Sequence, residues 1–488
     1  MRELTTRAFG MAIVVLGSLQ LMVVLDGTVA NLALARLQAD LGLSDSGRTW
    51  VLTSYALAFG GLMLLGGRLG DVFGRKRMFI VGVALFTVAS LLCGIAVNET
   101  MLLASRAFQG VGAAIASPTA FALVATTFAP GKARNQAIAI FAAMTGLGSV
   151  AGLVIGGALT QVSWRWIFWI NVPIGIVIVA LAFVALHESE NAKRITLDVP
   201  GAVLATVGCT AVVFGMMEGI NIGWTSPVII GSLVLGILTL GLFLYVERTA
   251  NNPLFPFVLF RNPNRVAALV AIFFAGAMLL SMTMYVALFV QDLLGYSPLT
   301  AGLAFIPFAV GIGAGAQIAS KLTLSVQPRW VVLAGSALMV VGLLYGSTLD
   351  GSADYLTDLL PPTIAIGLGV GLALVPLPLC AIAGVGPSEI GPLTAIGTVA
   401  QTLGGPLGIA IISVFATSRT IADGGSVDIK VAEMSDYQLI ALGNGYTFAL
   451  VGCAAAAALA GVAALFMRFT PADIAEAQAA EKAAQLAD

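Results

Sequence analysis

Residues 199–246 read VPGAVLATVGCTAVVFGMMEGINIGWTSPVIIGSLVLGILTLGLFLYV. They contain two apolar runs, Val199–Met217 and Val228–Val246, and Trp224 stands between them in a position typical of an interfacial anchor. A helix needs roughly 20 mostly apolar residues to cross a bilayer, so each run is long enough for one span. The sequence therefore predicts a transmembrane hairpin at a place where a cytoplasmic loop would be the alternative.

The rest of the 488-residue chain has the same apolar character. Hydrophobic residues make up 59% of it and charged residues only 10%, whereas soluble domains carry roughly a quarter charged residues. The net charge of −1 excludes the basic surface that a nucleic-acid-binding protein needs. We predict an all-α polytopic membrane protein with fourteen transmembrane helices, two six-helix bundles plus the inserted hairpin. The predicted spans are 9–33, 48–67, 78–97, 101–125, 136–160, 165–186, 198–218, 226–246, 266–290, 299–320, 330–349, 359–384, 391–416 and 446–467.

The Lys and Arg residues predict the orientation. If the N-terminus is cytoplasmic, 17 of the 23 fall in cytoplasmic segments and five in outer segments. Cytoplasmic loops carry such an excess, which favours a bacterial plasma membrane protein with both termini cytoplasmic. The predicted regions are an N-terminal bundle at 1–187, the hairpin with an interfacial segment (Pro253–Phe260) at 188–264, a C-terminal bundle at 265–470 and a cytoplasmic tail helix at 471–488.

Two charged residues lie inside predicted spans of the N-terminal bundle. Asp26 is the acid in LQLMVVLDGTVANLAL, and an ionised carboxylate within a membrane costs about 2.5–3.5 kcal/mol on insertion scales. Arg106 shares one helix face with Gln109 and Gly110, at i+3 and i+4. We interpret Asp26 as a proton-coupling carboxylate and Arg106 as its electrostatic partner. The alternatives are a structural carboxylate paired with a hydroxyl or an Arg, and an Arg that holds backbone carbonyls.

Sparse polar side chains in the other spans predict an apolar cavity with a few hydrogen-bonding points, which suits amphiphiles better than sugars. Its candidate lining residues are Gln20, Met22, Tyr55, Gln109, Asn171, Gln317 and Gln401. No phosphate-binding G-x-x-x-x-G-K-[ST] motif is present, so we expect no ATP and no cofactor besides a proton gradient. The four cysteines and the single histidine show no metal-ligand spacing, and no catalytic set of nucleophile and base is visible, so we expect no metal site and no enzyme.

Two glycine patterns have mechanical interpretations. The loop 67–77, GRLGDVFGRKR, has one acid among four cations, and we expect it to act as a cytoplasmic gate, with an ordinary positively charged loop as the alternative. Its gate residues are Gly67, Asp71, Gly74, Arg75 and Lys76.

Glycines at four-residue spacing predict close helix packing in the fifth span, with a glycine-rich counterpart in the thirteenth. The packing glycines are Gly148, Gly152, Gly156 and Gly157.

Several of these stretches together resemble one family. Residues 67–79 are similar to the loop 2–3 signature of the major facilitator superfamily, and 103–114 and 148–159 are similar to its span 4 and span 5 signatures. Residues 25–34, LDGTVANLAL, resemble the span 1 signature of the fourteen-helix drug:proton antiporter branch. Leu153 and Ala35 depart from the pattern, because the signatures have Pro at these two positions.

The resemblance implies a two-bundle transporter that works by alternating access, with a site near the bilayer midplane. It also implies proton-coupled export of hydrophobic or cationic amphiphiles. Export or flipping of lipids is the alternative, and a non-transporting receptor or a channel is a third. The expected partners are amphiphilic small molecules, or lipids, and the bilayer.

Overall fold

The computed structural model describes residues 6–128, 132–186, 188, 198–249, 260–323, 325–385, 387–426 and 431–473, and these contain helices and no strands. The helices are α1 Thr6–Leu41, α2 Asp45–Phe73, α3 Arg75–Gly94, α4 Glu99–Thr127, α5 Lys132–Val162, α6 Trp166–Trp169, α7 Asn171–Ala185, α8 Val199–Ile222, α9 Pro227–Thr249, α10 Pro263–Leu288, η2 Phe289–Leu293, α11 Pro298–Ala304, α12 Ile306–Leu322, α13 Pro328–Gly346, η3 Tyr355–Leu359, α14 Leu360–Leu374, α15 Pro376–Ile382, α16 Pro387–Ala422, η4 Val431–Glu433 and α17 Asp436–Leu465.

Thirteen helical segments among the described residues are long and apolar enough to cross a membrane. The remaining long helix, α5, has 31 residues and occupies the fifth predicted span. The all-helical membrane fold is thus confirmed, while the count of fourteen spans stays a prediction. Both runs of the predicted hairpin are helical, as α8 and α9, and pack against each other.

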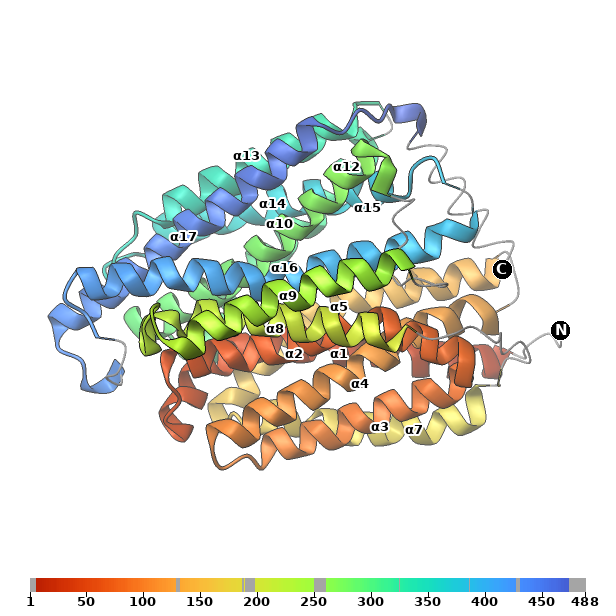
Figure 1. The fold of residues 1–488 in the computed structure, drawn as a ribbon, viewed down its shortest axis with the longest axis horizontal. Helices are drawn as coiled ribbons and strands as arrows, with labels where there is room; N and C mark the ends of the chain where they lie inside the picture. Colours follow the sequence, from red (N-terminus) through yellow and green to blue (C-terminus); the bar gives the residue numbers. More distant parts are fainter. Residues whose placement is uncertain are drawn as a thin grey trace.

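The helices form two groups with α8 and α9 beside them (Figure 1). Helices α1–α7 pack among themselves and are called the N group below; α10–α17 do the same and are called the C group. The groups meet where α2 packs on α16 and where α5 packs on α11. Helix α8 contacts both α2 and α16, so it lies along the junction of the two groups.

The ends of the helices alternate as the predicted topology requires. Helix α1 begins and α17 ends at the right-hand end of the assembly in Figure 1. We call this the inner end, because it is the predicted cytoplasmic side. The opposite end, where α2 and α17 begin, is called the outer end.

The predicted tail helix is described only at its start. There the Thr470 hydroxyl accepts a hydrogen bond from the Asp473 backbone N–H, and the Asp473 carboxylate accepts one from the Thr470 backbone N–H. Residues 474–488 and all of the interfacial segment except Phe260 lie outside the described residues.

Glycines set the closest helix contacts in both groups. Gly148, Gly152 and Gly156 of α5 face α1, where a Cβ at Gly156 would come within 2.7 Å of Val29. Gly157, predicted as one of the same packing glycines, faces α11 instead, where a Cβ would lie 2.7 Å from the Pro298 carbonyl oxygen. In the C group, a Cβ at Gly408 of α16 would lie 2.7 Å from the Cα of Ala277 in α10. Pairs α1–α5 and α10–α16 are therefore packed in the same way, as an internal repeat requires.

Candidate transport site

Asp26 lies at the centre of a polar cluster within the N group. Arg106 of α4 donates from Nη1 to Asp26 Oδ2 at 2.6 Å, and Gln109 donates from Nε2 to Asp26 Oδ1 at 2.7 Å. Asn171, at the start of α7, donates to the same Oδ1 at 3.0 Å. Asp26 and Arg106 are only 2% and 1% exposed, and Gln109 and Asn171 are fully buried. The structure therefore pairs the two charges that stand out in the sequence.

The surroundings hold the Arg106 guanidinium in place. Its Nε donates to the backbone carbonyl of Val51 at 3.0 Å, and its Nη1 donates to Gln109 Oε1 at 2.7 Å. The guanidinium carbon lies 4.4 Å from the centre of the Tyr55 ring and 5.7 Å from that of Phe168. Such a cation over an aromatic face is attracted by the negative ring surface. Arg106 thus has partners on α1, α2, α4 and the short helix α6.

This arrangement balances the charges within one group of helices. Removal of one partner from a buried ion pair costs about 3–5 kcal/mol, because the other charge stays uncompensated. The close approach of α2 and α4 depends on Gly110, since a Cβ there would lie 2.9 Å from that of Ala58. The Asp26 cluster can therefore move with the N group as one unit.

The seven predicted cavity residues do not line one cavity, although Tyr55, Gln109 and Asn171 meet at the Asp26–Arg106 pair. Met22, Gln109 and Asn171 are fully buried among the N-group helices, and Tyr55 packs on Arg106. Gln317 is exposed on α12, and Gln401 lies on α16 in the C group. Gln20 is partly buried on α1, two turns before Asp26. These positions were predicted because their side chains are polar. Which neighbouring helix packs on each of them decides whether the side chain faces a cavity.

A separate pocket lies in the C group around Gln401. It has about 450 Å³ of empty space and is lined by α10, α13, α14, α15 and α16. Among the described lining residues Gln401 alone has a polar side chain; the others are Ile272, Ala275, Met278, Leu279, Met339, Val370, Ala373, Leu374, Leu377 and Pro378. Such an apolar pocket with a single amide suits the hydrophobic part of an amphiphile.

The prediction of a loop at 67–77 is wrong: these residues form the last turns of α2 and the first turn of α3, joined at Gly74 alone, and they are held within the N group. Arg75 donates from Nη2 to Asp71 Oδ1 at 3.0 Å, and Lys76 donates from Nζ to the carbonyls of Phe183 and Leu186 at the end of α7. Gly74 has a φ of 100°, a conformation that L side chains rarely adopt, and a Cβ there would lie 2.7 Å from the Glu188 carboxylate. Gly67 lies beside Pro118 of α4. The glycine at 74 is thus required by the turn itself.

A second buried ion pair, which the sequence does not predict, joins the two groups at the outer end. Arg48 of α2 donates from Nη1 to Asp292 Oδ2 at 3.1 Å, and the side chains are 3% and 6% exposed. Arg48 Nη2 also donates to the hydroxyl of Tyr446 in α17 at 2.8 Å. In the sequence both charges stand at ends of apolar runs, where charges are ordinary, so no signal distinguished them.

The sequence of this chain is similar to that of known transporters. A sequence model described as Major Facilitator Superfamily matches residues 16–409. The chain is 50% identical over 481 residues to "Uncharacterized MFS-type transporter EfpA" of Mycobacterium tuberculosis, a span that covers 98% of this chain and 90% of the relative. It is 38% identical to "Puromycin resistance protein pur8" of Streptomyces alboniger, over 84% of this chain and 82% of that protein. It is 36% identical to "Cephamycin export protein CmcT" of Amycolatopsis lactamdurans, over 84% of this chain and 85% of that protein.

The fold is shared with solved transporters. A bacterial homologue of the human lysosomal transporter Spinster, in an inward-facing and unoccupied conformation, superposes with a TM-score of 0.69 at 16% identity. The match covers 95% of this chain and 98% of that one. The resemblance found in the signatures of spans 4 and 5 and of residues 67–77 is confirmed. On the family model, the relatives and the helical architecture together, this chain is a multi-pass membrane transporter and belongs to the Major Facilitator Superfamily.

Proposed function

We propose that this chain is a proton-driven exporter of hydrophobic or cationic amphiphiles, and that Asp26 is the group that carries the proton. The observation behind the proposal is the buried Asp26 cluster in a chain whose relatives include a puromycin resistance protein and a cephamycin export protein. An acid buried at this depth in a span is costly, and such residues mark ion and proton pathways in membrane proteins.

The hydrogen bonds suggest how Asp26 would take and release a proton. Arg106, Gln109 and Asn171 all donate to its carboxylate, so in this conformation the oxygens need no proton of their own. A movement that separates Arg106 from Asp26 leaves a buried carboxylate without its countercharge, and proton binding then removes the cost. Alternation between these arrangements would couple proton movement to the conformational change.

A transport assay tests this role. The purified full chain is placed in liposomes with an imposed pH gradient, and uphill movement of ethidium is followed by fluorescence. Asp26→Asn should abolish uphill transport, while downhill movement of ethidium continues. Asp40→Asn is the matched control, because Asp40 is an acid on the same helix but is half-exposed at the outer end, and its transport should stay at the wild-type rate. Full uphill transport by Asp26→Asn would contradict the proposal.

Lipid export is the second candidate, and the Gln401 pocket favours it. Ten of the eleven described lining residues have apolar side chains, a lining that suits acyl chains as well as the apolar part of a drug. Reconstituted protein would then move fluorescent phospholipids between leaflets in a manner that depends on Asp26. Ethidium transport without lipid movement would exclude this second function.

We also propose the plasma membrane of a bacterium as the location, with both termini cytoplasmic. The support is the excess of Lys and Arg in the segments of the inner end. Protease accessibility of tags at the two termini in inside-out vesicles tests the orientation.

A further inference from the structure

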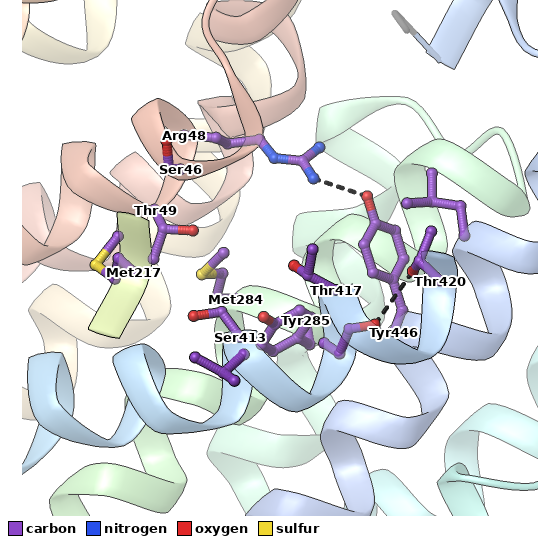
Figure 2. Close-up of a pocket in the computed structure, with 13 residues that line it drawn as sticks. Ser46, Arg48, Thr49, Met217, Met284, Tyr285, Ser413, Thr417, Thr420 and Tyr446 are labelled. Atoms are coloured by element: carbon purple, nitrogen blue, oxygen red, sulfur yellow. Dashed lines mark hydrogen bonds between the residues drawn. The ribbon is translucent and has the colours of Figure 1, made fainter. Parts of the chain in front are cut away.

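Arg48, the partner of Asp292, lines a pocket at the outer end, between the two groups (Figure 2). The pocket has about 590 Å³ of empty space and is partly open. Arg48 points across it toward Tyr446, and both side chains line it, from α2 and α17 respectively. Hydroxyl groups line much of the remainder, from Thr49, Tyr285, Ser413, Thr417 and Thr420.

The partners of Arg48 belong to different groups. Its Nη1 donates to Gln38 Oε1 of α1 at 2.8 Å, a bond within the N group. Its bonds to Asp292 and Tyr446 cross to the C group. When the outer ends separate, as alternating access requires, Gln38 keeps Arg48 with the N group and the crossing bonds break.

The side chains left behind in the C group have the chemistry of a cation site. The Tyr446 hydroxyl donates to Asp292 Oδ2 at 2.9 Å, so the carboxylate is fixed beside the ring. That ring lies 5.8 Å from the guanidinium carbon of Arg48 and 6.0 Å from the Tyr285 ring. Carboxylates and aromatic faces are the groups that bind organic cations in proteins. Asp292 also sits in the π-helical turn η2, a feature that is frequent at functional sites.

We propose that Asp292, Tyr446 and Tyr285 form a binding site for lipophilic organic cations, which Arg48 fills while the outer ends are together. The inference rests on the export function proposed above and names a cargo class and a release site for it. When the outer end opens, a cation with an apolar body takes the place of Arg48. When the end closes, Arg48 returns and displaces the cation to the outside, so the residue acts as a tethered competitor.

Tetraphenylphosphonium binding to the full chain in lipid nanodiscs tests the proposal. Arg48→Gln removes the competitor but keeps a hydrogen-bonding amide, so tetraphenylphosphonium should bind about tenfold more tightly than to wild type. Neither Asp292→Asn nor the double variant Arg48→Gln/Asp292→Asn should bind more tightly than wild type. Arg36→Gln is the matched control, because Arg36 also lies at the outer end but donates to the Thr160 and Gln161 carbonyls of the N group, and its binding should equal wild type.

A second pair of variants tests the aromatic ring of Tyr446 separately from the Arg48–Asp292 ion pair. In the Arg48→Gln background, Tyr446→Phe keeps the ring but loses the hydroxyl that fixes Asp292, so it should weaken tetraphenylphosphonium binding less than Tyr446→Leu does. Tyr446→Leu removes the ring and should weaken binding there about fivefold. Equal binding by Arg48→Gln, Asp292→Asn and wild type, in protein that still exports ethidium, would overturn the site alone. A wild-type protein that exports no test compound would instead overturn the proposed function.

Discussion

The two buried ion pairs of this transporter have the same chemistry and different mechanical consequences. Asp26 and Arg106 both belong to the N group and are 2% and 1% exposed. Arg48 and Asp292 are nearly as buried but belong to different groups. A pair within one group can persist while the groups move, whereas a pair between groups must break each time the outer end opens.

This difference separates two tasks that both depend on buried charge. The Asp26 pair has its other donors, Gln109 and Asn171, in the same group, so separation of the two groups does not by itself break it, and the proton binding proposed above needs a movement within the N group. Arg48 lines a partly open pocket, so its guanidinium meets water when it separates from Asp292. Solvation then offsets part of the cost of separation, which a pair inside a sealed core would bear in full. The Asp26–Arg106 pair suits proton coupling, and the Arg48–Asp292 pair suits gating.

The largest effect should follow from loss of Arg106. Arg106→Ala leaves Asp26 buried without its countercharge, which costs about 3–5 kcal/mol in stability. We expect a lower melting temperature in detergent than for Arg48→Ala, and no uphill ethidium transport. Arg106→Lys keeps the charge but loses the planar guanidinium and should retain partial transport. Equal melting temperatures of Arg106→Ala and Arg48→Ala would remove the distinction between the two pairs.

The Asp26–Arg106 pair could be predicted from the sequence for a physical reason. An acid in the middle of a 25-residue apolar run is rare enough to stand out, and the spacing of Arg106 and Gln109 puts both on one helix face. Arg48 and Asp292 stand where apolar runs begin and end, so their burial depends on how α2 meets α17 and η2, which no local pattern encodes.

The same limit applies to the packing and cavity residues. Spacing alone predicted a single ridge through Gly148, Gly152, Gly156 and Gly157, but the last of these faces α11 rather than α1. Polarity alone suggested Gln317 as a cavity residue, yet it is exposed on α12. Composition establishes which residues can pack closely or bind polar groups; the neighbouring helix decides which of them do.

An intermediate effect is expected at the inner end, where the comparison can be sharpened. In this structure Asp71 pairs with Arg75 four residues away, in the same group, while the outer pair is closed. If Asp71 contacts the opposite group when the inner end closes, Asp71→Asn should favour the inner-open state about tenfold, or roughly 1.4 kcal/mol. Thiol labelling of Thr398→Cys, one turn from Gln401, measures this change in a background without the four buried native cysteines.

The control for that experiment is a pair with the same spacing at the other end of the molecule. Arg419 and Asp423 also form an i,i+4 ion pair, 3.2 Å apart, at the outer end of α16. Asp423→Asn should leave the labelling rate of Thr398→Cys unchanged. An unchanged rate in Asp71→Asn as well would show that residues 67–77 only set topology.

The smallest effect is expected where an ion pair is neither buried nor shared between groups. Asp40 and Arg165 lie 3.9 Å apart, with side chains 58% and 31% exposed, and both belong to the N group. Exposed pairs contribute about 0–1 kcal/mol, because water and salt screen the charges. Asp40 also accepts a hydrogen bond from the buried Trp164 indole at 2.8 Å, and an Asn side chain can still accept that bond through its carbonyl oxygen. A double-mutant cycle of Asp40→Asn and Arg165→Gln, followed by melting temperature, should therefore give a coupling energy below about 1 kcal/mol and wild-type transport. A coupling as large as that of Asp26 with Arg106 would mean that position within the helix groups does not decide what a charge pair contributes.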